Sequence, residues 1–228
     1  MTIDAIPHWV PTERLSRAFA FACDVHAKQP RKGTAIPYIA HLMGVASLAI
    51  EHGADEEITI AALLHDAAED QGGRPMLALI DDRFGARVAK IVEGCTDTFE
   101  IPKPDWAVRK AAYIDHLRHA DFDVCLVSAA DKLHNARAIL HDLRNIGPDV
   151  FRRFSAPAEQ TGWYYGSVAR VLHQRLAGTE AVALPGALFH AVEEIAAHKG
   201  GEAFGAGAAH GKRGEALLNR TPRGRPSS

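Results

Sequence analysis

Apolar residues recur along most of the chain at the three- and four-residue spacing of amphipathic helices. In the segment after Thr12, for example, Leu15, Phe19, Ala22 and His26 fall on one helical face. The two-residue alternation that is typical of half-buried strands is scarce, and glycine or proline interrupts the helical pattern every 15–25 residues. The pattern predicts an all-α bundle of about eight to ten helices without an internal repeat.

The expected helices begin at residues that favour helix starts. Pro37 suits a first helical position and Asp55 suits a cap, while Gly72 and Gly73 are expected to close the helix that Asp55 opens. The predicted helices span residues 13–28, 37–52, 56–70, 75–84, 85–93, 105–119, 123–144, 157–176 and 185–198.

The last part of the sequence differs in composition from the rest. The chain of 228 residues has 26 Lys and Arg against 28 Asp and Glu, but residues 199–228 hold six cations and two anions. The same stretch holds seven of the nineteen glycines and almost no periodic apolar pattern. We therefore expect a folded domain over residues 1–198 and a disordered basic tail over residues 199–228. A solvated tail is favoured over one that contacts RNA or an acidic partner.

Composition also narrows the class of protein. There is no run of 18 apolar residues to span a membrane, and Asp4 stands where a signal peptide would be basic. The three cysteines are scattered and predict buried thiols rather than a disulfide framework. The near-neutral charge argues against nucleic-acid binding. A cytoplasmic protein with no membrane partner is expected, and no particular oligomeric state is predicted.

Three sequence segments place polar residues on otherwise apolar predicted helices: His41 in PYIAH, His65 and Asp66 in LLHDAAED, and Asp131 in SAADKLHN. A buried carboxylate is costly unless it is paired with a cation. Any one of these residues alone would be interpreted as a satisfied core or cap residue. Together, two imidazoles and two carboxylates form a ligand set that suits Mn²⁺, Fe²⁺ or Zn²⁺ and leaves positions open for water and substrate.

Four sequence motifs occur in a characteristic order: RKGTAIPYIAH, LLHDAAED, FGARVAKIVEGCTD and ADKLHNAR. In this order the chain resembles the HD-domain metal phosphohydrolases, and most of all the (p)ppGpp hydrolase domain of the RelA/SpoT family in its stand-alone small alarmone hydrolases. The resemblance covers roughly residues 13–180. It implies hydrolysis of the alarmones of the stringent response, and it leaves no room for the family's synthetase domain.

The resemblance assigns roles to individual residues. The family's metal ligands, usually for Mn²⁺, correspond to His41, His65, Asp66 and Asp131. The family also has a pair of acidic residues that activates or positions the attacking water, and this pair corresponds to Glu69 and Asp70. Each acidic residue lies four positions after a ligand, so helical geometry puts both near the metal-binding turn. Without the metal set, Glu69 and Asp70 would be interpreted as the solvated acidic end of a helix.

Substrate-binding residues are also implied. Arg31 and Lys32 correspond to a basic pair that can hold diphosphate oxygens, although an exposed basic loop has the same sequence. Asn135 lies four positions after Asp131 and corresponds to a family residue near the nucleotide. Either Tyr164 or Tyr165 corresponds to a late tyrosine near the substrate.

Three positions depart from the family pattern: Leu42 stands where proline is common, Gln71 where threonine is frequent, and Ala138 where a small polar residue is frequent. None belongs to the metal set, so the implied hydrolysis of guanosine tetra- or pentaphosphate to GDP or GTP and pyrophosphate stands. The departures bear on which nucleotide base is preferred. Hydrolysis of another phosphorylated nucleotide, such as NADPH, ppApp or a nucleoside phosphate, and a catalytically silent nucleotide-binding module are the alternatives.

Overall fold

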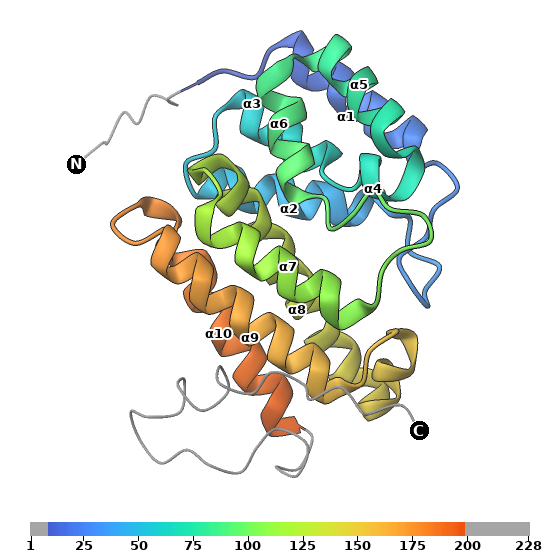
Figure 1. Cartoon of the computed structure of the whole chain (residues 1–228), viewed down its shortest axis with the longest axis vertical. Helices are drawn as coiled ribbons and strands as arrows, with labels where there is room; N and C mark the ends of the chain where they lie inside the picture. The colour runs from blue at the N-terminus through green and yellow to red at the C-terminus, as the bar shows by residue number, and fades with distance from the viewer. Residues whose placement is uncertain (1–8, 199–228) are drawn as a thin grey trace, which may run out of the picture. The chain divides into compact units, whose positions relative to one another are not determined.

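The computed structural model describes residues 9–198, and its regular elements are helices (Figure 1). Within these residues the only pairing of strand type is a single bridge between Pro30 and Pro37, so the all-α prediction is confirmed. The helices are α1 (Glu13–Val25), α2 (Ile39–Glu51), α3 (Glu56–Leu64), α4 (Ala67–Gln71), α5 (Gly73–Phe84), α6 (Ala86–Cys95), α7 (Trp106–His119), α8 (Phe122–Ile146), α9 (Ala158–Arg175) and α10 (Ala183–His198), with 3₁₀ turns η1 (Gly147–Arg153) and η2 (Glu180–Val182).

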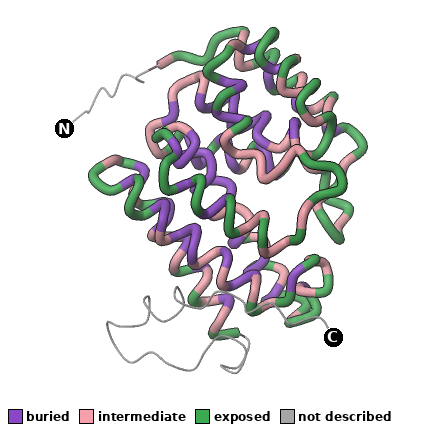
Figure 2. Tube along the Cα trace, in the orientation of Figure 1, coloured by how far each residue is buried: buried purple, intermediate pink, exposed green. Residues whose placement is uncertain are grey.

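The chain divides into two compact units. Within the described residues, the first comprises residues 9–99 and Asp121–Ala130, so it holds α1 to α6 and the beginning of α8. Helix α3 packs against α1, α2 and α6 and is buried at every position from Ile58 to Leu64 (Figure 2). The burial of α3 on all sides makes it the central helix of this unit, and the residue that follows it is His65.

Within the described residues, the second unit comprises Glu100–Ala120 and residues 131–198. In it, α9 packs against both α7 and α10. Its core includes leucines that are almost fully buried, namely Leu117, Leu133, Leu172, Leu176, Leu184 and Leu188. Burial of a leucine side chain stabilises a fold by about 1.5–3 kcal/mol.

The helix caps agree with the sequence. Thr12 accepts a hydrogen bond from the amide of Arg14 at the start of α1, and Asp55 accepts one from the amide of Ile58 at the start of α3. Such side-chain caps satisfy amides that have no partner inside the helix, and each contributes about 1 kcal/mol. The cap at Asp55 fixes where α3 begins.

The end of α3 differs from the prediction. A continuous helix was expected over residues 56–70, but α3 ends at Leu64 and α4 begins at Ala67. His65 Nδ1 lies 2.8 Å from the carbonyl oxygen of Ala62, the acceptor that the amide of Asp66 would use in a continuous helix. The imidazole competes for this acceptor, and the chain turns at His65 and Asp66. Next, Gly73 adopts a positive φ of 60° and already begins α5, two residues before the predicted start.

Two sequence expectations concern the ends of the chain and membranes. The proposed tail over residues 199–228 lies outside the described residues, so the division into a domain and a tail stays a prediction. Among the residues that are described, none of the helices combines the length and the hydropathy needed to cross a bilayer.

Candidate metal centre

Three consecutive helices of the first unit supply the residues of the candidate metal centre. His41 lies in the first turn of α2, His65 follows the last residue of α3, and Asp66 precedes the first residue of α4. Both imidazoles are buried, whereas the side chain of Asp66 is partly exposed. The break between α3 and α4 therefore places a histidine and an aspartate, adjacent in sequence, opposite the histidine of α2.

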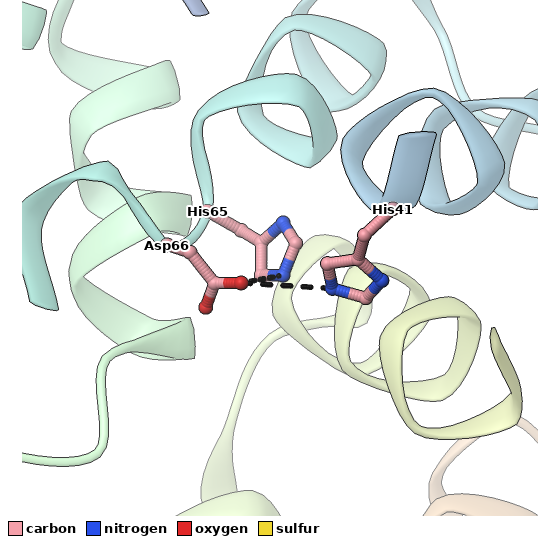
Figure 3. A group of neighbouring side chains, drawn as sticks. All are labelled: His41, His65 and Asp66. Atoms are coloured by element: carbon pink, nitrogen blue, oxygen red, sulfur yellow. Dashed lines mark ion pairs between the residues drawn. The ribbon is translucent and has the colours of Figure 1, made fainter. Parts of the chain in front are cut away.

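The ligand atoms of these three residues converge (Figure 3). Oδ2 of Asp66 lies 3.0 Å from Nε2 of His65 and 3.6 Å from Nε2 of His41, and one ligand atom from each residue falls within 4.8 Å of the others. The two imidazole rings meet edge to face, with their centroids 5.3 Å apart. Three of the four predicted ligands are thus brought together.

The hydrogen bonding of His65 fits a divalent cation. The carbonyl oxygen of Ala62 can only accept, so Nδ1 of His65 carries the proton that is donated to it. In the neutral ring Nε2 then presents a lone pair, and that lone pair faces the carboxylate oxygen of Asp66. Electron-rich atoms in this arrangement are stabilised by a cation between them. Two imidazoles and a carboxylate are a donor set used for Mn²⁺, Fe²⁺ and Zn²⁺.

Tyr38 supports this arrangement from the start of α2. Its hydroxyl donates to Oδ2 of Asp66 at 2.5 Å, and its ring stands edge-on to His41 with the centroids 5.5 Å apart. A hydroxyl bonded to a ligating carboxylate fixes the orientation of that carboxylate. Tyr38 stands in the segment PYIAH, and no pattern in the sequence indicates its role.

Glu69 and Asp70 lie in α4, close in sequence to the ligands, and their side chains contact different segments. Oε2 of Glu69 accepts the amide of Asp97 at 3.0 Å, whereas Oδ2 of Asp70 accepts the side-chain amide of Gln29 at 2.7 Å. The backbone amide of Asp70 donates to the carbonyl of Asp66 at 2.9 Å, so the predicted four-residue relation holds for Asp66 and Asp70. Each carboxylate thus has a hydrogen-bond partner outside α4, and the catalytic role of Glu69 and Asp70 stays a prediction.

The basic pair lies on the loop between α1 and α2. The guanidinium of Arg31 stands over the ring of Tyr38, 5.7 Å from its centroid, and Tyr38 in turn contacts Asp66. Tyr38 therefore lies between the guanidinium of Arg31 and the candidate ligand Asp66. Lys32 is exposed on the same loop.

Asp131 and Asn135 belong to the second unit, where α8 continues. Asp131 is buried and its carboxylate accepts from the side-chain amide of Asn135, which confirms that the two residues share a helical face. The carboxylate also pairs with the ammonium group of Lys132. The cation that a buried Asp131 requires is therefore supplied within this unit by the adjacent residue, Lys132. The role of Asp131 as a metal ligand stays a prediction.

Lys132 is held in its charged form. Burial by itself would lower the pKa of its ammonium group, but the attraction of Asp131 and of nearby tyrosines outweighs it and raises the pKa well above the ordinary value. Tyr164, one of the two candidate late tyrosines, is buried beneath Lys110, whose Nζ lies 4.9 Å from the ring centroid. Tyr165 is only partly buried.

Comparisons with known proteins were made by family, sequence and structure. A family model described as an HD domain matches residues 18–161. The guanosine-3′,5′-bis(diphosphate) 3′-pyrophosphohydrolase MESH1 of Danio rerio is 39% identical over 134 residues, covering 57% of this chain and 68% of that protein. The guanosine-3′,5′-bis(diphosphate) 3′-pyrophosphohydrolase of Aquifex aeolicus is 38% identical over 127 residues, covering 56% of this chain but only 18% of that protein.

Among solved structures, one described as a metazoan orthologue of SpoT that hydrolyses ppGpp is similar over 85% of this chain and 99% of its own. The TM-score is 0.62 and the sequence identity is 25%.

Proposed function

The chain belongs to the HD-domain family, and from this premise we propose that it hydrolyses guanosine 3′,5′-bis(diphosphate), and the corresponding pentaphosphate, to GDP or GTP and pyrophosphate. The convergence of His41, His65 and Asp66 carries the proposal, because it provides a metal-binding donor set in a chain whose relatives are named for this reaction. A cytoplasmic location and a role in the stringent response are part of the proposal.

Four residues are proposed to hold the metal, with Mn²⁺ as the proposed ion: His41, His65, Asp66 and, from the sequence resemblance, Asp131. A bound divalent ion supplies a Lewis acid that polarises a phosphoryl oxygen and makes a neighbouring water a stronger acid. His65 contributes Nε2 because its Nδ1 proton is committed to Ala62. Tyr38 keeps the carboxylate of Asp66 turned toward both imidazoles.

Glu69 and Asp70 are proposed to take or relay the proton of the attacking water. Attack at the phosphorus next to the ribose forms a new oxygen–phosphorus bond and breaks the bond from phosphorus to the 3′-oxygen. The pyrophosphate group leaves intact, and the ribose 3′-oxygen ends as a hydroxyl.

Arg31 and Lys32 are proposed to bind the diphosphate, and Asn135 to lie near the nucleotide. Arginine can donate two parallel hydrogen bonds to phosphate oxygens, whereas lysine acts as a point charge. Holding the distal phosphate leaves the phosphate next to the ribose available for attack. Arg31→Ala and Lys32→Ala should therefore mainly raise KM, if binding of the ground state and of the transition state is weakened alike.

The experiment that tests the proposal is a hydrolysis screen of the purified chain, supplied with Mn²⁺, on ppGpp, ppApp, NADPH and nucleoside monophosphates. We expect ppGpp to have the highest kcat/KM. A higher kcat/KM for another nucleotide would keep the HD-domain assignment and replace the substrate. Absence of turnover on every compound would favour a silent binding module.

A further inference from the structure

A hydrogen-bonded chain of side chains runs from the end of α1 to the acidic pair of α4. Gln29 lies in the turn after α1, and its Nε2 donates to Oδ2 of Asp70 at 2.7 Å, across 41 positions of sequence. Asp70 is exposed, on a helix of five residues. Packing alone does not hold a carboxylate in such a place, so the bond from Gln29 contributes directly to its orientation.

The side-chain amide of Gln29 is itself oriented by two donors. Nδ1 of His26 lies 2.7 Å from Oε1 of Gln29, and the side-chain amide of Gln71 donates to the same oxygen. An oxygen that accepts two N–H groups leaves the NH₂ group of Gln29 to face Asp70. The reversed amide would place its NH₂ group against that of Gln71 and its oxygen against a carboxylate. Gln71, a departure from the family pattern, therefore strengthens this orientation.

His26 fixes the other end of the chain. Its ring is only 3% exposed and stacks on Tyr38, with the centroids 5.1 Å apart and the planes 21° from parallel. The backbone is also tied here, since the amide of Gln29 donates to the carbonyl of His26 at 3.0 Å and the amide of Tyr38 to the carbonyl of Gln29 at 2.9 Å. One buried imidazole thus supports two carboxylates, Asp66 through Tyr38 and Asp70 through Gln29.

We propose that Gln29 is a positioning residue that holds the carboxylate of Asp70 in the orientation in which it accepts a proton from the attacking water, with His26 and Gln71 fixing the amide of Gln29. A neutral amide suits this task, because an ammonium or guanidinium group in its place would lower the basicity of Asp70 far more. This inference rests on the proposed function, since Asp70 needs an orientation only if water is activated beside it.

The test is a double-mutant cycle on ppGpp hydrolysis with Gln29→Ala, Asp70→Asn and the double variant. We expect Gln29→Ala to lower kcat by about 10- to 100-fold, the usual effect of losing a partner of a site residue, with KM, bound metal and melting temperature unchanged. In the Asp70→Asn background the same substitution should change kcat by less than about twofold, because its effect passes through Asp70.

Two further variants sharpen the cycle. Gln29→Glu keeps the shape of the side chain but turns an oxygen toward Asp70, so we expect at least the loss of kcat seen with alanine. Gln174→Ala, at an exposed glutamine of α9, is the matched control and should leave kcat unchanged.

Each contrary result identifies what is wrong. If Asp70→Asn slows hydrolysis and Gln29→Ala does not, the positioning role is wrong and the proposed function stands. An equal loss in both backgrounds, or a loss that follows the melting temperature, would show that Gln29 is structural only. If the wild-type chain does not hydrolyse ppGpp, or if Asp70→Asn is fully active, the catalytic assignment fails and this inference fails with it.

Discussion

The hydroxyl of Tyr38 donates to Oδ2 of Asp66 across 2.5 Å, and that oxygen is the one that faces both imidazoles of the candidate metal centre. The bond joins the start of α2 to the break between α3 and α4, over 28 positions of sequence. The bond orients the carboxylate of Asp66 and does not involve the Nε2 atom of His41 or of His65. We therefore propose that Tyr38 supports the candidate metal centre without belonging to its ligand set.

Replacing Tyr38 by phenylalanine should weaken metal binding. The substitution removes the hydroxyl and keeps the ring that stacks on His26, so we expect Mn²⁺ affinity to fall about 10- to 100-fold with little change in melting temperature. Calorimetric titration with Mn²⁺ measures the affinity. Tyr38→Ala, which also removes the stacked ring, should lower the melting temperature as well. Unchanged affinity in Tyr38→Phe would mean that the hydroxyl does not orient a ligand.

Substitutions at Asp131 and Lys132 should distinguish a loss of bound metal from a loss of stability. Their side chains are 7% and 14% exposed, and Asp131→Asn leaves the ammonium group buried without its carboxylate, a loss of about 3–5 kcal/mol for pairs of this kind. We expect this variant to lose both stability and bound metal. Adding Lys132→Met should recover much of the melting temperature and none of the metal, measured by elemental analysis. Full metal content in Asp131→Asn would remove Asp131 from the proposed ligands.

Substitution of the acidic pair should separate chemistry from binding. Glu69→Gln and Asp70→Asn keep the shape of each side chain and remove its basicity, so turnover should drop by about 10²- to 10⁴-fold while metal stays bound. Glu51→Gln, at an exposed position of α2, serves as the control. Steady-state kinetics with parallel metal analysis gives both readouts. Wild-type turnover in both variants would leave Glu69 and Asp70 as structural residues.

The stability of the first unit should depend on pH through Arg87. Its guanidinium lies 2.6 Å from Asp55 and 3.1 Å from Glu57, at the start of the helix that leads to His65. Burial would raise the pKa of Asp55, but the amide of Ile58 and the guanidinium of Arg87 outweigh it and lower that pKa. Hydrogen bonding to Arg14, followed by Arg87, lowers the pKa of Glu57.

Carboxyl groups whose folded pKa is depressed stabilise the fold above their unfolded pKa of about 4, and they lose this contribution as the pH falls through the folded values. These side chains are 30–46% exposed, so we expect Arg87→Ala to lower the free energy of unfolding by only about 0.5–1 kcal/mol at neutral pH. Below about pH 4, the free energy of unfolding of this variant should fall less steeply with decreasing pH than that of the wild type; this pH dependence is called the acid limb. Urea unfolding as a function of pH measures both. Arg152→Ala, at an 84% exposed arginine, should leave the acid limb unchanged, and an unchanged limb in Arg87→Ala would contradict the assignment.

The sequence was sufficient for the features that depend on local patterns. Helical spacing predicted the all-α fold, and Asp55 was predicted to cap a helix because capping is a property of a few adjacent residues. His41, His65 and Asp66 could be grouped because each interrupts an apolar helix face, and the structure brings them together.

The features that the sequence did not predict depend on contacts between distant segments or on competition within the backbone. Periodicity continues through His65, so it cannot reveal that the imidazole competes for the carbonyl of Ala62 and ends α3. The bonds from Gln29 to Asp70 and from Tyr38 to Asp66 join residues far apart in sequence, and no local pattern marks them. Lys132, by contrast, adjoins Asp131 in sequence, so the ion pair between them could have been predicted from the two opposite charges.

The most direct test of the central claim is phosphorus NMR of the reaction of the purified chain with ppGpp and Mn²⁺, free of contaminating pyrophosphatase, in water enriched in ¹⁸O. The account predicts GDP and intact pyrophosphate as the first products, with the ¹⁸O label on pyrophosphate, and no reaction in His65→Ala. Orthophosphate as the first product, or pyrophosphate release that persists in His65→Ala, would contradict it.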